Sequence, residues 1–129
     1  MENLLPRVLT GIVTHGKALA RTFDIPTANI EPAENIDGLA YGVYASTVTV
    51  DGRNYRGVTN LGVRPTVADG DRVNAETFIL DFDGDLYGKR ITVTLCVFLR
   101  PEKKFNSVEE LMEQIRKDIS YVMIFQKGL

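Results

Sequence analysis

The chain has 129 residues, which is enough for one domain with its own core and too few for two. Its apolar fraction of 44% and charged fraction of 25% are typical of a globular domain. The net charge of −2 argues against broad binding of nucleic acid, which needs a basic surface. A single cysteine, Cys96, excludes an intrachain disulfide, and a single histidine, His15, argues against histidine-based zinc or nucleophile chemistry.

The sequence carries no apolar run near the ~20 residues of a membrane span. Its N-terminus lacks the basic start and apolar core of a signal peptide. We therefore expect one domain over residues 1–129 that acts in the cytoplasm as a monomer, with no membrane and no nucleic acid among its partners.

The first half of the chain is rich in strand patterns. Residues 8–14 indicate a strand, residues 15–25 a loop without a clean period, and residues 30–39 a turn-rich stretch. Two β-rich runs follow, 41–50 and 53–63, joined by Asp51-Gly52. That dipeptide predicts a hairpin with a type I′ turn, because both central residues of such a turn need a positive φ.

The second half predicts more strands and one helix. Residues 62–72 indicate a loop, 73–82 a strand, 83–85 a turn and 90–99 a further strand. In this last strand the alternation predicts one apolar face, made of Ile91, Val93, Leu95 and Val97. The opposite face would then carry Thr92, Thr94, Cys96 and Phe98.

The C-terminal stretch predicts an amphipathic helix over residues 107–125. Ser107 and Glu110 fit a capping box at its start. Apolar residues then recur at three- and four-residue spacing up to Met123, and the polar side carries Glu109, Glu113, Arg116 and Lys117. Strands joined by hairpins and followed by one helix favour a small antiparallel barrel, whose open mouth the helix can cover.

The segment Pro26-Thr27-Ala28-Asn29 carries the first chemical signal. In an extended chain, side chains two residues apart share a side, so Thr27 and Asn29 would face the same spot. A hydroxyl and an amide oxygen are hard ligands of the kind that Mg²⁺ accepts together with phosphates and waters. The alternative is a proline-initiated turn in which both side chains bond the backbone.

Several stretches together resemble the riboflavin kinase family, the domain that phosphorylates riboflavin to FMN. In chain order they are Gly11-x-Val13-x-x-Gly16, residues 26–30 (PTANI), 42–44 (GVY), 57–66 (GVTNLGVRPT), 76–88 (ETFILDFDGDLYG), 98–111 (FLRPEKKFNSVEEL) and 114–119 (QIRKDI). The resemblance implies an all-β fold, a six-stranded antiparallel Greek-key barrel with a C-terminal α-helix. It also implies ATP as co-substrate and riboflavin and FMN as substrate and product.

The same resemblance implies roles for particular residues. Thr27 and Asn29 match the positions that hold Mg²⁺, and Glu76 matches the catalytic base. The nucleotide side would comprise Gly16, Lys17, Arg21, Pro26, Thr27, Asn29, Asn60 and Arg64. The flavin side would comprise Arg100, Glu102, Phe105 and Asp118. Without the family match, Glu76 would be interpreted as an exposed strand residue and Asp118 as part of a solvated helix face.

The chain departs from the family pattern between Gly16 and Pro26. Ala18, Ala20 and Asp24 stand where glycines are expected, and a glycine-rich loop is what lets backbone N–H groups crowd around phosphates. The alternative function is therefore a non-catalytic, regulatory flavin- or nucleotide-binding protein derived from the kinase. The nucleotidyltransferase half of bifunctional relatives is absent, so FAD synthesis is not expected, and the start Met1-Glu2-Asn3 favours a stand-alone protein.

Overall fold

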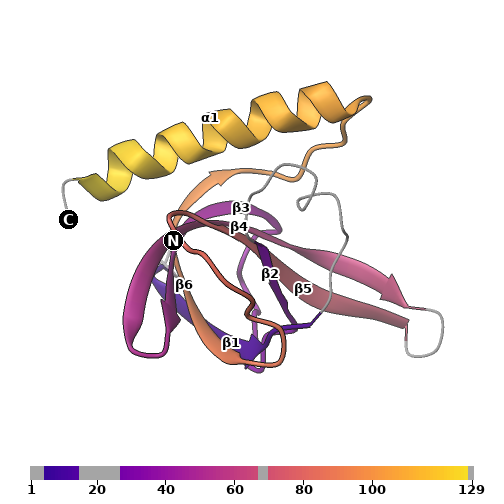
Figure 1. The fold of residues 1–129 in the computed structure, drawn as a ribbon. Helices are drawn as coiled ribbons and strands as arrows, with labels where there is room; N and C mark the ends of the chain where they lie inside the picture. The colour runs from indigo at the N-terminus through magenta and orange to yellow at the C-terminus, as the bar shows by residue number, and fades with distance from the viewer. Residues whose placement is uncertain (1–4, 15–26, 67–69, 128–129) are drawn as a thin grey trace.

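The structure is a computed structural model that describes residues 5–14, 27–66 and 70–127. Six strands are followed by one helix (Figure 1). They are β1 (Arg7–Ile12), β2 (Thr27–Ile30), β3 (Gly42–Val50), β4 (Arg53–Thr66), β5 (Gly70–Ile79), β6 (Arg90–Arg100) and α1 (Val108–Lys127).

All strand pairs are antiparallel, and the six strands form one sheet in the order β1-β6-β3-β4-β5-β2. The two outer strands approach each other just after β1, where Thr14 forms a bridge with Asn29 of β2. The Thr14 N–H donates to the Asn29 carbonyl at 2.8 Å. The sheet therefore curls into a barrel, and the predicted six-stranded antiparallel barrel with a C-terminal helix is confirmed.

The barrel interior is filled by apolar side chains from all six strands, and its largest fully buried members include Leu9, Ile30, Tyr44, Leu61, Ile79, Ile91 and Leu95. It also contains a row of three buried hydroxyls. Ser46 and Thr59 share a hydrogen bond of 2.7 Å, and Thr59 and Thr77 share another of 2.7 Å. Each buried hydroxyl in this row thus has a partner, as stable interiors require.

Helix α1 lies against the outside of the barrel, not over its mouth as predicted (Figure 1). Its Val122 and Ile119 pack with Val43, Ala45 and Val58 on the outer faces of β3 and β4. The physical reason is that these outer faces are apolar and must be covered, while the barrel interior is already filled by its own strands. The residues between the sheet and the helix form a second, smaller hydrophobic core.

The predicted hairpin at Asp51-Gly52 is confirmed. Asp51 has a φ of 50° and Gly52 a φ of 79°, as a type I′ turn requires, and Val50 pairs with Arg53 across it.

The predicted loop over residues 62–72 is wrong. Strand β4 runs to Thr66, and β5 begins at Gly70. Strand β3 starts at Gly42 opposite Leu61, so β4 pairs with β5 alone beyond that point. A proline on this one-sided stretch interrupts no second ladder, which is why Pro65 is compatible with a strand.

Residue Val97 does not share the inner face of β6 as predicted. The register shifts from Ser46↔Leu95 to Ala45↔Val97, so Cys96 is an extra residue in a β-bulge. Val97 therefore packs in the core under the helix, while Ile91, Val93 and Leu95 are buried in the barrel as expected. The strand continues one residue beyond the predicted end, to Arg100.

The helix is capped by the predicted pair Ser107 and Glu110, but the Glu110 carboxylate bonds the residue before Ser107 and not Ser107 itself. The Glu110 N–H donates to the Ser107 hydroxyl at 3.2 Å, and the Glu110 carboxylate accepts from the Asn106 N–H at 2.9 Å. Among the residues that the structure describes, no helix has the length and apolar character needed to cross a bilayer.

Candidate active site

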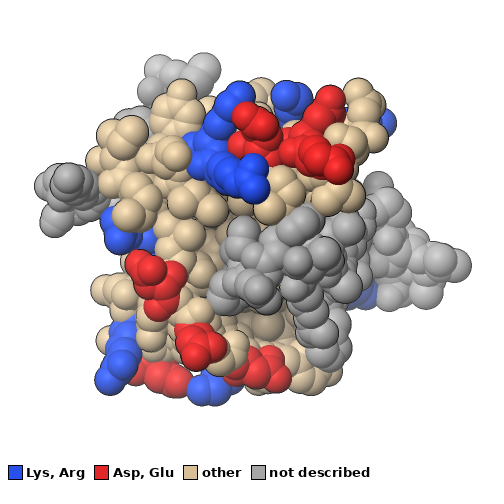
Figure 2. Space-filling model, turned by 45° about the horizontal axis from the view of Figure 1, so that its top comes forward, with Lys and Arg blue, Asp and Glu red and all other residues tan. Residues whose placement is uncertain are grey.

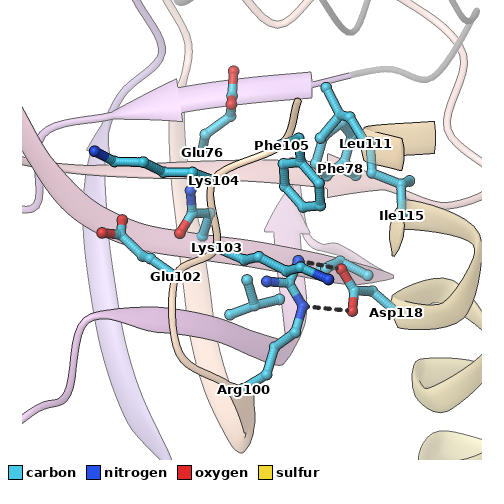
Figure 3. A pocket seen from close by; sticks show the side chains of 13 residues that line it. Glu76, Phe78, Arg100, Glu102, Lys103, Lys104, Phe105, Leu111, Ile115 and Asp118 are labelled. Atoms are coloured by element: carbon cyan, nitrogen blue, oxygen red, sulfur yellow. Dashed lines mark hydrogen bonds and ion pairs between the residues drawn. The ribbon is translucent and has the colours of Figure 1, made fainter. Parts of the chain in front are cut away.

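A cavity of about 600 Å³ lies between the outer face of the sheet and the first half of α1 (Figure 3). A connecting segment between β6 and α1, residues 101–106, covers it and is called the strap below. The volume is within the range of small-molecule sites, roughly 300–1,000 Å³. The lining comprises Val43, Val58, Asn60, Glu76, Phe78, Arg100, Glu102, Lys103, Lys104, Phe105, Leu111, Ile115 and Asp118.

The polar end of the cavity is organised by strand register. Glu76 of β5 pairs with Asn29 of β2 on one side and with Asn60 of β4 on the other. Its neighbours along β5, Ala75 and Thr77, are fully buried in the barrel, so the Glu76 side chain points to the outer face. Three adjacent strands thus present an amide, a carboxylate and an amide side by side.

Asn29 stands beside the cavity and is only 4% exposed. Its Oδ1 atom is buried and accepts no hydrogen bond from the residues that the structure describes, while its Nδ2 atom lies 3.5 Å from the Thr14 hydroxyl. A buried acceptor without a donor is unfavourable, and a cation ligand resolves it. Because β2 is extended, Thr27 shares this side of the strand. The two residues therefore fit a magnesium ion that completes its shell with phosphates and waters.

The other end of the cavity is apolar. Val43 and Val58 come from the sheet, Phe105 from the strap, and Leu111 and Ile115 from α1. Phe78, two residues after Glu76 on the same face of β5, leads from the polar end into this region (Figure 3). A flat aromatic ring system fits such surroundings.

A partly buried ion pair between Arg100 and Asp118 forms the floor of the apolar end. Arg100 donates from Nε to Asp118 Oδ1 at 3.0 Å and from Nη2 to Asp118 Oδ2 at 2.8 Å (Figure 3). Asp118 is only 3% exposed, so the alternative of a solvated helix face is wrong. This two-bond pairing fixes the end of β6 to α1 in one geometry.

The strap brings three charged side chains to the cavity. Glu102 lies over Gly62, where a Cβ atom would come within 2.1 Å of the Glu102 Oε1 atom. Lys103 Nζ lies 5.7 Å from the centre of the Phe105 ring, and Lys104 lines the cavity beside it. Both lysines were missed from sequence, although the pair in the PEKKF stretch was the available signal.

A family model described as Flavokinase, riboflavin kinase, matches residues 4–125. The chain belongs to the riboflavin kinase family. It is 41% identical over 115 residues to the RNA-binding riboflavin kinase RibR of Bacillus subtilis (strain 168), covering 89% of this chain and 49% of that protein. It is 43% identical over 121 residues to the bifunctional riboflavin kinase/FMN adenylyltransferase of Pseudomonas fluorescens, covering 92% and 39%. The chain thus spans less than half the length of these two curated relatives.

Two solved structures resemble this riboflavin kinase family member. One is titled a macrolide-efflux protein from Streptococcus pneumoniae, with a TM-score of 0.81, 32% identity, and coverage of 91% of this chain and 38% of that one. The other is the riboflavin kinase from Trypanosoma brucei, with a TM-score of 0.58, 22% identity, and coverage of 93% and 79%. This second likeness shows a shared fold.

The structure brings most of the described site residues expected from the family together. One cavity is lined by Asn60, Glu76, Arg100, Glu102, Phe105 and Asp118, with Thr27 and Asn29 on the strand beside it. Gly16, Lys17, Arg21 and Pro26 lie outside the described residues. For Arg64 only the backbone is described, and it pairs with Arg72. Apart from Phe105, the apolar lining was missed from sequence as part of a site, because outer-face valines and the helix residues Leu111 and Ile115 look like ordinary core residues.

Proposed function

We propose that this chain is a riboflavin kinase that transfers the γ-phosphate of ATP to the ribityl 5′-hydroxyl of riboflavin, giving FMN and ADP. The observation that carries the proposal is the division of one cavity into two ends. A carboxylate flanked by two amides stands at one end, and the other end is lined by apolar and aromatic side chains. A flavin has the matching division into a flat ring and a polyol chain.

With the ring at the apolar end, the ribityl chain extends toward Glu76. The Glu76 carboxylate accepts the proton of the 5′-hydroxyl as its oxygen attacks the γ-phosphorus. The new oxygen–phosphorus bond forms while the bond to the bridging oxygen breaks, and that oxygen leaves with ADP. In phosphoryl transfer the protein acts by positioning and charge stabilisation, and the rigid strand register around Glu76 suits that task.

We assign the metal position to the Thr27 hydroxyl and the Asn29 Oδ1 atom. Magnesium bound there would neutralise phosphate charge, as the reaction class requires. The nucleotide side is proposed to include Gly16, Lys17, Arg21, Pro26, Asn60 and Arg64. The flavin side is proposed to include Glu102, Phe105 and the Arg100–Asp118 pair.

We further propose a cytoplasmic monomer whose partners are its small-molecule substrates. The relative RibR is named as RNA-binding, and this chain covers 49% of it. On the face drawn in Figure 2, however, acidic and basic side chains are interspersed and do not form a broad basic surface. The net charge of −2 also supports the proposal that nucleic acid is not a partner.

The deciding experiment is incubation of the purified protein with riboflavin, ATP and Mg²⁺, followed by chromatography for FMN. FMN above a no-enzyme control is the expected result. Riboflavin binding, measured by its fluorescence, without FMN would instead support the non-catalytic alternative. That alternative rests on Ala18, Ala20 and Asp24, which replace the expected glycines of the phosphate loop.

A further inference from the structure

We propose that Gln114 is a positioning residue for the flavin ring, which acts on the ligand only through Asp118 and Arg100. This inference deepens the proposed function and rests on it. It explains how one arginine at the floor of the cavity is held in a single orientation.

The first step is the state of Arg100. A guanidinium group has five N–H donors in one plane. Two of them bond Asp118, and a third, on Nη1, bonds the Pro101 carbonyl at 3.2 Å. One N–H on each Nη nitrogen is left without a bond to the residues that the structure describes. Arg100 lines the main cavity, and we infer that an acceptor bound there takes these two N–H groups.

The second step is the state of Asp118. Its Oδ1 atom accepts from Arg100 Nε and also from Gln114 Nε2, at 3.1 Å. Gln114 lies one helical turn before Asp118 on α1, so the helix itself fixes the distance between them. The Gln114 bond therefore restrains the rotation of the carboxylate, and the carboxylate restrains the plane of the guanidinium.

The third step is the place of Gln114. It does not line the main cavity but a second one of about 380 Å³, together with Leu99, Lys117 and Tyr121. Arg100 and Asp118 line both cavities and form the wall between them. Gln114 thus bonds Asp118 from the second cavity, on the side away from the proposed flavin. In this proposal it affects flavin binding by changing the orientation of Asp118 and Arg100.

The ligand group that suits the remaining Arg100 donors is the acceptor edge of the isoalloxazine ring, which carries two carbonyl oxygens. A planar donor recognises a planar acceptor edge only when its orientation is fixed. We therefore expect the Gln114–Asp118–Arg100 chain of bonds to contribute to affinity for the ring and not to affinity for the nucleotide.

The test measures the Kd of riboflavin and of lumiflavin, which has the ring without the ribityl chain, by fluorescence, and the Kd of MgADP by calorimetry. For Gln114→Leu, loss of one restraining bond is expected to raise both flavin Kd values about three- to tenfold and to leave the MgADP Kd unchanged. Lys117→Leu, in the same second cavity but outside the bond network, is the matched control and should leave all three values unchanged.

A double-mutant cycle separates positioning from general packing. Asp118→Asn should weaken flavin binding more than Gln114→Leu, and the combined variant should bind no worse than Asp118→Asn alone, because Gln114 acts only through Asp118. Thermal unfolding of each variant checks folding. Additive effects, an equal loss of MgADP affinity, or wild-type flavin binding by Gln114→Leu would overturn the inference. Failure of the wild-type protein to bind flavin or form FMN would overturn the proposed function itself.

Discussion

Glu76 stands between two amide side chains in the strand register, and it is the residue on which the proposed chemistry depends most directly. Glu76→Gln keeps the size and hydrogen-bonding capacity of the side chain but removes the proton acceptor. We expect kcat to fall by about 10²–10⁴-fold, the usual effect of losing a general base, with riboflavin affinity nearly unchanged. Steady-state kinetics and a fluorescence titration measure the two quantities, and wild-type turnover by the variant would exclude Glu76 as the base.

Asn29 is expected to affect ligand binding and stability in opposite directions. Its buried Oδ1 atom has no donor among the described residues. Asn29→Leu removes this acceptor at similar volume. In the absence of ligands we expect the variant to be as stable as the wild type or more stable by about 1 kcal/mol, because an unsatisfied buried group is lost. We expect MgADP to raise the Tm of the wild-type protein and not that of the variant. An unchanged MgADP effect on Tm would remove Asn29 from the metal site.

At the scale of elements, the pairing of the start of β3 with the end of β6, where Val43 is opposite Arg100, positions Arg100. Gly42 has a φ of 152°, and a Cβ there would lie 2.4 Å from the Arg100 carbonyl oxygen and 2.8 Å from Cε1 of Phe98. Backbone cannot yield easily, so Gly42→Ala should destabilise the fold by about 2–3 kcal/mol and also weaken riboflavin binding. Gly88→Ala is the control, because Gly88 has a φ of 82° but open space around it. Denaturant unfolding and riboflavin titration of both variants give the comparison, and equal effects would show backbone strain alone.

The same elements show what the sequence could and could not predict. The Asp51-Gly52 hairpin was predictable because its turn type depends on two local φ angles. The extension of β4 to Thr66 was not, because Gly62 and Pro65 are turn residues locally and only the pairing with β5 makes them strand. The bulge at Cys96 was equally invisible, since the alternation of Ile91 to Val97 carries no sign of a register shift.

Some features of the candidate site could likewise be predicted from the sequence, and others could not. The family resemblance was enough to identify Glu76, Asn60 and Phe105 as cavity residues. It did not reveal that Asp118 is buried and bound to Arg100, although the helical spacing places Asp118 between Ile115 and Val122, on the apolar side of the helix. Pairing between residues 18 positions apart depends on how α1 packs on the sheet, and no local pattern encodes that.

At the scale of the whole molecule, closure of the barrel depends on the segment after β2. The Ala33 N–H donates to the Thr10 carbonyl, and the Glu34 carboxylate accepts from both the N–H and the hydroxyl of Thr10. Burial alone would raise the pKa of Glu34, but the bonds from Thr10 and the charge of Arg90 bring that pKa below the ordinary value of 4.5. The charged form of Glu34 is therefore stabilised by the fold.

This pKa shift predicts that the free energy of unfolding falls when Glu34 is protonated at low pH. A carboxyl whose pKa is lower in the folded than in the unfolded state adds stability that is full above about pH 4.5 and is lost as pH falls through the folded pKa. Glu34→Gln should thus be less stable than the wild type at pH 7, and the difference should shrink below pH 4.5. Urea unfolding at a series of pH values measures it. A difference that stays constant with pH would mean that the charge of Glu34 does not contribute.

The Thr14–Asn29 bridge joins the two margins of the sheet at the residue whose side chain is assigned to the metal. The backbone of Asn29 is bonded to the chain after β1 on one side and paired with β5 on the other. Folding therefore already pays the entropic cost of fixing the backbone of Asn29, and a cation bound at its Oδ1 atom as proposed would meet a preorganised ligand. The contact that closes the barrel therefore also fixes the backbone of the proposed metal ligand.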